Sequence, residues 1–337
     1  VQTCALPISL ALSGWSTHWN WSFGKAAELA VLSFFSMSGF LVAQSFYRSP
    51  NWTDYFAKRA LRIYPAYLTV VVLFFLILNL VYFNTLPLRS FWDQVYYLSV
   101  NLLFLNFLKP SLTGILDENP VPVLNGSLWT IKIEVLFYCL LPPLLNFARY
   151  LGIRVVLPVI YIIVCLLMQI FHKAIPSHLE VHLIRELLLP LSHFLAGVLY
   201  LIFFNVLPKG NFPQVVLLWI VTIPLSVSLT ERLPCHYALS GALSLVAPCL
   251  LTISTLTTAR LDIRPSEFSI PDFSYSLYLT HFPLTQILCA FGANQLTPIP
   301  YWIIVLGAQW SFAYFFWRWV ERPLLNFGDR RRQNAFF

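Results

Sequence analysis

The sequence has little charge for its length. Only 10% of its 337 residues are Asp, Glu, Lys or Arg, whereas a soluble domain carries about 25%. Hydrophobic residues make up 58% of the chain, and its mean hydropathy is +0.71. A water-soluble core cannot hide this much apolar surface, so the composition excludes a soluble globular protein. It indicates a polytopic membrane protein whose surroundings are the lipid bilayer.

Cysteine is scarce and shows no pattern. None of the six cysteines belongs to a Cys-x-x-Cys pair or has the spacing of a metal site. Most lie in apolar stretches, where the thiol behaves as a small hydrophobic group. The sequence therefore predicts no disulfide framework and no metal. It also lacks a stripe of Lys and Arg, so we expect no nucleic-acid partner.

Long apolar runs are what the sequence has instead. A run of about 20 apolar residues crosses the hydrocarbon of a bilayer as a helix. We predict an all-α, polytopic transmembrane helix bundle with nine clear spans plus a truncated first span in residues 1–14, about ten in the intact protein. The nine lie at about 28–46, 63–83, 127–147, 153–171, 186–205, 213–230, 236–256, 274–291 and 300–320.

The distribution of Lys and Arg predicts the orientation of the bundle. If the loop 48–62 is cytoplasmic and the spans alternate, 14 of the 21 basic residues are cytoplasmic, six lie outside and Lys132 lies within a span. This excess agrees with the positive-inside rule. It places the C-terminus, with the basic tail 326–337, in the cytoplasm.

The segment 91–108 is apolar but is interrupted by Asp93, Gln94, Asn101 and Asn106. If it crossed the bilayer, every later loop would change side and the cytoplasmic excess of positive charge would be lost. We therefore expect a helix that lies at the outer interface or re-enters the membrane. The loop 109–126 then stays outside and could wall a pocket that faces away from the cytoplasm.

Small residues and prolines inside the runs predict local packing. Ser36, Ser38 and Gly39 would let neighbouring helices approach closely, although the same place could leave room for an acyl chain or a pantetheine arm. Pro142 and Pro143 interrupt the run 127–147, so we expect a kink there.

Glu134 is the one glutamate that sits several residues inside an apolar run. A carboxylate at membrane depth costs at least ~2.5–3.5 kcal/mol if it has no partner, which makes this residue a candidate for function. Ser127 precedes it by seven residues, so both fall on one face of a helix. Glu134 either makes a structural contact with a neighbouring helix, or orients a base or an acceptor hydroxyl.

Three other polar residues are candidates. Arg59 and Arg62 share a helical face at the cytoplasmic edge, where they are either a positive-inside anchor or a fork for phosphate groups. His281 lies in the middle of the run 274–291, where it is either a packing histidine or part of a bent, polar-lined helix.

Taken in order, these motifs resemble membrane acyltransferase family 3, the multi-pass enzymes that O-acylate sugars of bacterial envelopes. The resemblance covers about residues 9–325, which we expect to be the acyltransferase domain. It implies a cytoplasmic acyl-CoA donor, acetyl-CoA in the first instance, and a glycan acceptor outside. The matching residues are Ser38-Gly39-Phe40-Leu41, Arg59-Ala60-Leu61-Arg62-Ile63-Tyr64-Pro65, Asn125-Gly126-Ser127-Leu128-Trp129-Thr130 with Glu134 and Tyr138, Ser274-Tyr275-Ser276-Leu277-Tyr278, and Glu321-Arg322-Pro323.

The resemblance also implies roles for single residues. Its double-Arg motif falls on Arg59 and Arg62, which would handle the donor. Its Trp-x-x-x-x-Glu motif makes Glu134 a supporting catalytic residue, while Lys132 departs from the small or apolar residue expected there. The implied location is the bacterial inner membrane. The substrate pocket would be lined by Asn125, Ser127, Trp129, Tyr138 and His281.

The first span departs most from the family pattern. The family carries a catalytic His there, which the register against Leu12-Ser13-Gly14 puts near position 8, where this sequence has Ile8. We expect residues 1–8 to be foreign to the natural protein, and the chain as printed to be inactive. In the intact protein a His base would activate the acceptor hydroxyl, whether by direct attack on the thioester or through an acyl-enzyme.

Two other classes of protein stay open. A multi-pass transporter of a polar solute would use a pocket around Glu134 and His281, with ion-coupled flux and no need of acyl-CoA. A membrane scaffold would need no chemistry. The sequence assigns no oligomeric state.

Overall fold

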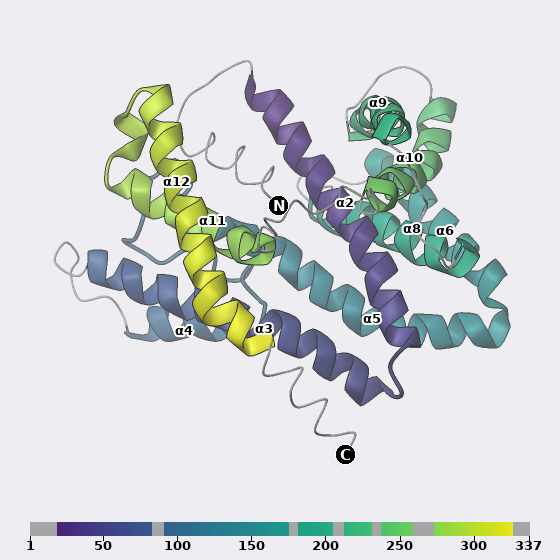
Figure 1. Ribbon diagram of the computed structural model, residues 1–337, viewed down its shortest axis with the longest axis horizontal. Coiled ribbons are helices and arrows are strands. Elements are labelled where there is room, and N and C mark those ends of the chain that lie inside the picture. Colours follow the sequence, from purple (N-terminus) through teal and green to yellow (C-terminus); the bar gives the residue numbers. More distant parts are fainter. Residues whose placement is uncertain are drawn as a thin grey trace. The chain divides into compact units, whose positions relative to one another are not determined.

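The described part of the chain is built of helices alone. The computed structural model describes residues 19–82, 91–174, 181–204, 212–230, 237–258 and 273–325. Within these ranges every regular element is helical (Figure 1), which confirms the all-α prediction. The elements are α2 (Trp19–Tyr47), α3 (Trp52–Val81), α4 (Phe91–Leu102), η1 (Gly126–Leu128), α5 (Trp129–Leu151), α6 (Ile153–Ala174), η2 (Val181–Leu188), α8 (Leu189–Phe204), α9 (Phe212–Thr230), α10 (Tyr237–Thr258), α11 (Ser274–Ala290), η3 (Ala293–Gln295), α12 (Pro298–Phe316) and η4 (Trp317–Glu321).

The helices divide between two compact units. The described residues of the first unit are 19–27, 56–82, 91–132 and 273–325. Those of the second unit are 28–55, 133–174, 181–204, 212–230 and 237–258. The helices α2, α3 and α5 each have residues in both units. The predicted acyltransferase domain, residues 9–325, includes residues of both and remains a prediction.

Six helical segments of the described chain are long and apolar enough to cross a membrane. Each overlaps one predicted span, but the count of nine is not confirmed. The predicted spans 213–230, 236–256 and 274–291 coincide with α9, α10 and α11, and the first-span remainder at 1–14 lies outside the described residues. The six segments are Ala26–Tyr47, Trp52–Val81, Gly126–Leu151, Ile153–Phe171, Glu186–Phe204 and Pro298–Leu325.

The helix α4 is too short to cross a bilayer. Its 12 residues rise by about 18 Å, whereas the hydrocarbon core is about 30 Å thick. Tyr97 and Asn101 are buried on one side of the helix, while Phe91 and Trp92 are 69% and 74% exposed. Burial raises the pKa of the Tyr97 phenol above its ordinary value. The helix predicted within 91–108 is therefore present as far as Leu102, and its place at the outer interface stays a prediction.

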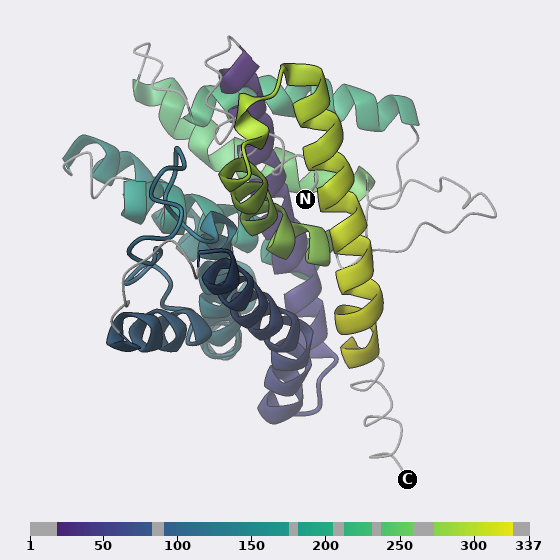
Figure 2. The ribbon, with the colours of Figure 1, turned by 90° about the vertical axis from the view of Figure 1, so that its left-hand side faces the viewer.

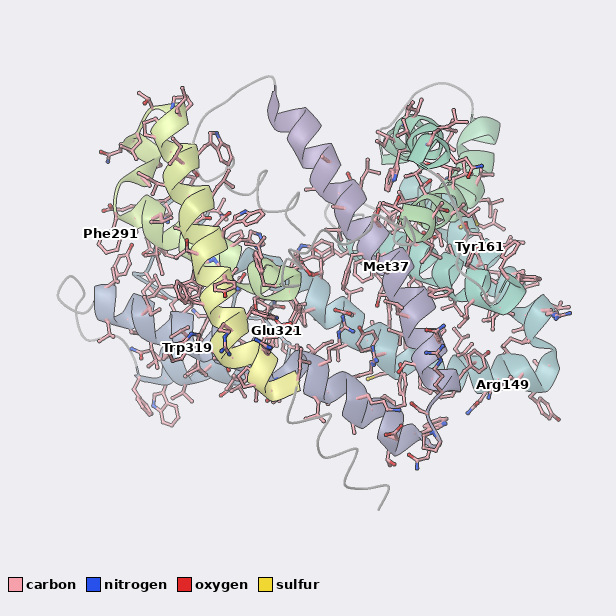
Figure 3. The ribbon with its side chains drawn as sticks, in the orientation of Figure 1. Met37, Arg149, Tyr161, Phe291, Trp319 and Glu321 are labelled. Carbon is pink, nitrogen blue, oxygen red and sulfur yellow. The ribbon has the colours of Figure 1, made fainter. Side chains whose placement is uncertain are left out.

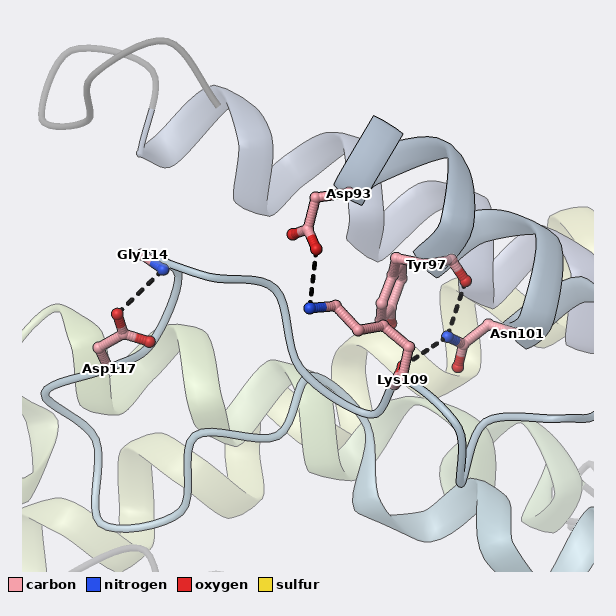
Figure 4. Close-up of polar contacts among 6 residues, drawn as sticks. All are labelled: Asp93, Tyr97, Asn101, Lys109, Gly114 and Asp117. Atoms are coloured by element: carbon pink, nitrogen blue, oxygen red, sulfur yellow. Dashed lines mark hydrogen bonds and ion pairs between the residues drawn. The ribbon is translucent and has the colours of Figure 1, made fainter. Parts of the chain in front are cut away.

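Polar contacts hold the loop that follows α4 (Figure 4). Lys109 Nζ lies 2.8 Å from a carboxylate oxygen of Asp93. Asn101 donates hydrogen bonds to the carbonyls of Tyr97 and Lys109 at 2.8 and 3.0 Å. The loop also supplies four residues to an apolar cluster, so it packs as part of the first unit. That cluster consists of Phe75, Leu78, Tyr97, Leu112, Ile115, Leu116 and Leu124.

In the second unit α2 and α8 approach each other closely. A Cβ added to Gly39 would lie 2.0 Å from the carbonyl oxygen of Phe194, and one added to Gly197 would lie 2.1 Å from that of Ser36. Thr252 on α10 donates a hydrogen bond to the Ser36 hydroxyl at 3.0 Å. The prediction of close helix packing is confirmed. The backbone of Phe194 fills the place where an acyl chain or pantetheine arm was considered.

In the first unit α11 and α12 lie side by side in both views (Figures 1 and 2). Gln309 on α12 donates a hydrogen bond to the Thr285 hydroxyl at 2.7 Å and a longer one, 3.4 Å, to the carbonyl of His281. The buried side of α11 is rich in polar residues, and five of them have no accessible surface. These are Ser276, Thr280, His281, Thr285 and Gln286. Polar side chains at this depth need partners, so α11 is where the first unit concentrates its hydrogen bonds.

Candidate functional site

The Asn125-Gly126-Ser127 motif forms the 3₁₀ turn η1, which is bound to α11. Asn125 caps the turn, because its Oδ1 accepts hydrogen bonds from the backbone N and the Oγ of Ser127 at 3.1 and 2.6 Å. Its Nδ2 donates to the carbonyl of Leu279 at 3.0 Å. The Tyr278 hydroxyl donates to the carbonyl of Ser127 at 2.8 Å. The polar groups of this motif therefore bind one another and α11, and a role in a substrate pocket stays a prediction.

Gly126 lets this turn lie against α11. A Cβ at that position would lie 2.6 Å from the ring of Phe282, closer than carbon atoms pack. Thr130 follows on the first turn of α5, where its hydroxyl contacts that of Tyr278 and donates to the carbonyl of Ser127 at 3.3 Å. The Asn125-Gly126-Ser127 motif and Thr130 thus join the start of α5 to the middle of α11.

The turn also alters the helical-face argument made from the sequence. The α-helix α5 begins at Trp129, and Ser127 precedes it in the tighter 3₁₀ geometry. The spacing of seven residues from Ser127 to Glu134 therefore does not run along one α-helix. The physical reason is the Asn125 cap, which fixes a 3₁₀ turn before the helix starts.

The arginine pair lies on a helix that is also bound to α11. Arg59 is partly buried and Arg62 is exposed, one turn apart on α3. The Tyr275 hydroxyl, in the first turn of α11, donates to the carbonyl of Ile63 at 3.2 Å. Since Ile63 follows Arg62 directly, this bond places the basic edge of α3 beside the N-terminal turn of α11.

Glu321 is buried, at 8% exposure, near the end of the last helical segment. Its Oε2 accepts a 2.5 Å hydrogen bond from the hydroxyl of Ser276 on α11. The neighbouring Arg322 lies over the ring of Trp317, 5.4 Å from its centre. Figure 3 shows Glu321 and the exposed Trp319 on this segment. The partner of this carboxylate in the Glu321-Arg322-Pro323 motif is therefore a buried serine.

His281 lies in the middle of α11 and has no accessible surface. Its Nδ1 lies 3.0 Å from the carbonyl oxygen of Leu277. A carbonyl only accepts, so Nδ1 carries the proton and Nε2 presents a lone pair. That Nε2 is buried and has no hydrogen-bond partner among the described residues. The ring of Tyr278 lies 5.8 Å away, centre to centre.

Glu134 and Tyr138 belong to the second unit. Glu134 is 5% exposed, and the Tyr138 hydroxyl, one helical turn later, donates to its Oε1. The Tyr55 hydroxyl in turn donates to the carbonyl of Tyr138 at 3.0 Å. The carboxylate therefore has a partner on its own helix, which lowers the cost of placing it at membrane depth. Its catalytic role stays a prediction.

Trp129 and Lys132, at the start of α5, are the remaining positions that the sequence singled out. Trp129 is partly buried at the first position of the helix. The ammonium group of Lys132 lies 4.8 Å from the centre of the Phe107 ring. This cation–π contact gives the unexpected lysine a partner that does not require a substrate.

Sequence reasoning missed a polar pair that joins the loop to α11. Asn119 donates to the backbone carbonyl and to the Oε1 of Gln286 at 3.0 and 2.7 Å. Gln286 donates to the carbonyls of Val121 and Val123 at 2.6 and 2.5 Å. The available signal was a glutamine inside an apolar run, which needs a partner for the same reason as Glu134 does.

The first unit thus gathers sequence-distant candidates on one helix. The Asn125–Ser127 turn, the helix that carries Arg59 and Arg62, and the Glu321 carboxylate all hydrogen-bond to α11, on which His281 lies. Within the described ranges, no three or more His, Cys, Asp or Glu side chains come together as metal ligands would. The arrangement offers a neutral imidazole with a free acceptor nitrogen and, on a neighbouring helix, two cations suited to phosphate.

Comparison with known proteins gives one family. A family model described as "Acyltransferase domain" matches residues 3–318. An O-acetyl transferase of Shigella phage Sf6 is 32% identical over 129 residues, which is 38% of this chain and 38% of that protein. Nodulation protein 10 of Rhizobium leguminosarum bv. viciae is 25% identical over 309 residues, 88% of this chain and 81% of that protein.

An uncharacterized protein of Haemophilus influenzae is 24% identical over 251 residues, 69% of this chain and 98% of its own length. No solved structure shows significant similarity to the chain. The similarity to the phage enzyme thus spans little more than a third of either protein, while the match to the family model runs through nearly all of the described helices.

Proposed function

Because this chain belongs to the acyltransferase-domain family, we propose that it transfers an acyl group from acyl-CoA to a hydroxyl of an exported or cell-envelope sugar. Acetyl-CoA, approached from the cytoplasm, is the proposed donor. The observation that carries the proposal is the family match over residues 3–318, which contains every candidate residue from Arg59 to His281. The name of the phage relative, an O-acetyl transferase, supports acetyl as the group and a hydroxyl as the acceptor.

The donor end of the site is the arginine pair. Arg59 and Arg62 on α3 have the spacing to bind the phosphates of coenzyme A, since a guanidinium group donates two parallel hydrogen bonds to one phosphate. The Tyr275 bond to Ile63 supports this role because it fixes α3 against α11 next to Arg62. The thioester would then extend along α11, away from the arginines.

The second supporting feature is Glu134. Its carboxylate is held by Tyr138 on the same helix, so the direction of the side chain is restricted. In the proposed reaction Glu134 positions a catalytic base or the acceptor hydroxyl. Asn125, Ser127 and Trp129, which precede it in the chain, keep their proposed place around the acceptor.

We propose that the protein lies in the bacterial inner membrane. The nine clear spans predicted from the sequence would cross it, and the C-terminus would be cytoplasmic. The six long apolar segments support the larger part of that count. The positive-inside excess supports the orientation, because Arg59 and Arg62 then face the compartment that supplies acyl-CoA. The partners are the bilayer and the glycan.

The test is to incubate radiolabelled acetyl-CoA with membranes that hold the full-length protein and to measure label in the polysaccharide fraction. We expect label to appear there, to fall at least tenfold with Glu134→Ala, and to require more acetyl-CoA for half-maximal rate with Arg59→Ala. Arg154→Ala is the matched control, because this arginine is exposed at the start of α6. It should leave the rate unchanged.

Absence of labelled polysaccharide with the full-length protein would contradict the proposal. Proton- or sodium-coupled flux of a polar solute in the same membranes, without label transfer, would favour the transporter instead. If Arg59→Ala needs no more acetyl-CoA for half-maximal rate than Arg154→Ala does, the arginine pair does not bind the donor. The proposed reaction itself would not be contradicted by that result.

A further inference from the structure

Arg149 is held by two aromatic rings at one end of the second unit. It lies in the last turn of α5 (Figure 3), and its side chain is exposed. The central carbon of its guanidinium group lies 4.5 Å from the centre of the Tyr47 ring and 5.7 Å from that of the Phe46 ring, at the end of α2. A cation–π contact uses the charge of the guanidinium group rather than its N–H donors. The side chain is therefore oriented and still able to bind an anion.

Positive charge exceeds negative charge at this end of the second unit. The residues 44–55 and 146–158 include three arginines and one acid, Asp54. One of these arginines, Arg48, follows α2 directly and is exposed. No Asp or Glu of the described chain forms an ion pair with Arg48 or Arg149. The ends of α2 and α5 thus carry two cations that attract an anion.

Both arginines lie where the headgroups of a bilayer would be. The apolar segment Ala26–Tyr47 ends at the residue before Arg48, and the apolar segment Gly126–Leu151 ends two residues after Arg149. The hydrocarbon of a bilayer ends where such segments end, so the guanidinium groups would lie at the level of the lipid phosphates. The sequence predicts that the loop 48–62 is cytoplasmic, and the cytoplasmic leaflet is the one that presents anionic lipids to basic residues.

An exposed apolar strip on α2 leads to these cations. Phe34 and Leu41 are 36% and 41% exposed. The backbone N of Arg48 donates a hydrogen bond to the carbonyl of Gln44 at 3.1 Å, so the helical path continues to this arginine. Spacings of seven residues place Phe34, Leu41 and Arg48 on one face of the helix. A phosphate bound at Arg48 would have an apolar strip beside it, which suits the acyl chain of a lipid better than a soluble nucleotide.

We propose that Arg149 and Arg48 form a binding site for the headgroup of an anionic phospholipid. The ring-held guanidinium group of Arg149 donates two parallel hydrogen bonds to the lipid phosphate. Arg48 adds a second positive charge, and an acyl chain of the lipid lies along Leu41 and Phe34. The bound lipid stabilises the second unit where α2 meets α5. This inference does not depend on the proposed acyl transfer.

Arg154 provides a matched control in the same chain. It follows Arg149 by five residues, in the first turn of α6, and it is also exposed. It differs in its surroundings, because no aromatic ring of the described chain lies against its guanidinium group. A general attraction of arginines to an anionic membrane would involve both residues equally. A headgroup site would depend on Arg149 and on the Tyr47 ring that orients it.

The experiment titrates the purified full-length protein, in a neutral detergent, with phosphatidylglycerol or with phosphatidylcholine of the same acyl chains. The readout is the rise of the thermal unfolding midpoint above the lipid-free value of the same variant, because a ligand of the folded state stabilises it by mass action. We expect phosphatidylglycerol to raise the midpoint of the parent and phosphatidylcholine to leave it nearly unchanged. Arg149→Gln should need about fivefold more phosphatidylglycerol for the same rise, the effect of one arginine near anionic lipid.

Two further variants separate a site from general charge. Tyr47→Leu keeps every arginine but removes the ring under Arg149, and it should need about threefold more phosphatidylglycerol than the parent. Arg154→Gln removes a charge without a ring contact, and it should stay within twofold of the parent. Because each variant is compared with its own lipid-free midpoint, a loss of stability alone does not change the result.

Each other result contradicts the lipid site. An equal rise with both lipids would show that the headgroup is not recognised. A parent-like response of Arg149→Gln or of Tyr47→Leu would remove the ring-held arginine from binding, and an equal loss with Arg154→Gln would indicate general charge. Coenzyme A, tested in place of lipid, should not raise the midpoint through Arg149. If it does so while phosphatidylglycerol does not, the phosphate bound there belongs to a soluble ligand.

Discussion

Ser276 Oγ donates a 2.5 Å hydrogen bond to Oε2 of Glu321, and both residues are buried. The bond joins the N-terminal turn of α11 to the last helical segment of the described chain. A serine and a glutamate separated by 45 residues therefore hold one end of the helix that carries His281. This relationship gives the Glu-Arg-Pro motif a structural purpose in the first unit.

The first prediction concerns this bond. Ser276→Ala should destabilise the protein by about 1.5–3 kcal/mol, the usual contribution of a hydrogen bond to a charged group. The measurement is the thermal unfolding midpoint in detergent. Ser311→Ala, at an exposed position of α12, is the control and should leave the midpoint unchanged. Equal midpoints for the two variants would show that Glu321 does not depend on Ser276.

The second prediction concerns the contact between α2 and α8. Gly39→Ala would place a methyl group 2.0 Å from the Phe194 carbonyl oxygen, so the helices must separate. Overpacking of this kind costs typically ~1–3 kcal/mol, and backbone atoms on both sides put the expected cost at the upper end. The measurement is the unfolding midpoint of the purified protein.

Gly307→Ala is the control for that substitution, because a Cβ on Gly307 meets nothing within 4 Å. This variant should keep or raise the unfolding midpoint, since alanine is favoured over glycine in a helix by roughly 0.5–1 kcal/mol. A Gly39→Ala protein as stable as the Gly307→Ala protein would contradict the close packing of α2 on α8.

The third prediction is a coupling between Gly126 and Phe282. Gly126→Ala alone should lower stability and acyl transfer, because its methyl group would meet the Phe282 ring at 2.6 Å. Phe282→Leu removes the part of the ring that is in the way, so the double variant should recover part of the loss. Contacting residues show interaction energies of about 0.5–3 kcal/mol in such cycles. Strictly additive effects on the unfolding midpoint would show that the turn does not lie against Phe282.

The fourth prediction concerns the partner of Glu134. Tyr138→Phe removes only the hydroxyl that donates to the carboxylate, and we expect acyl transfer to fall about tenfold, which is about 1.4 kcal/mol of lost stabilisation. Tyr150→Phe is the control on the same helix, since Tyr150 is 88% exposed. Full activity of Tyr138→Phe would mean that the bond to Glu134 does not position it for the reaction.

Much of the fold followed from hydropathy. Each of the nine predicted spans overlaps a helix of the described chain, although only six of these helical segments are long and apolar enough to cross a membrane. A helix satisfies the backbone groups of an apolar run within one segment, which is why apolar runs predict helices. The polar residues within 91–108 indicated that this segment does not cross the bilayer. The helix α4 in this segment is too short to cross, in agreement with that prediction. The close approach at Gly39 followed from its small neighbours.

The details of the candidate site followed less well. The spacing from Ser127 to Glu134 suggested a shared helical face, but the Asn125 cap starts the chain in a 3₁₀ turn. The pair of Asn119 and Gln286 was not anticipated, because its members are 167 residues apart in the sequence. A single sequence carries no information on which polar residues of distant segments meet.

The sequence by itself determined that this is a membrane protein with acyltransferase motifs, and it predicted the helices that the described residues form. The reason is that low charge and long apolar runs suit the lipid bilayer, where a helix satisfies its own backbone groups. Only the tertiary structure decided what those motifs bind. It showed that the Asn125–Ser127 turn, the arginine-bearing helix and Glu321 all contact α11, and that His281 on this helix has a buried nitrogen without a partner in the described chain. The reason is physical: hydropathy is a property of each segment alone, whereas a hydrogen bond depends on where two segments meet.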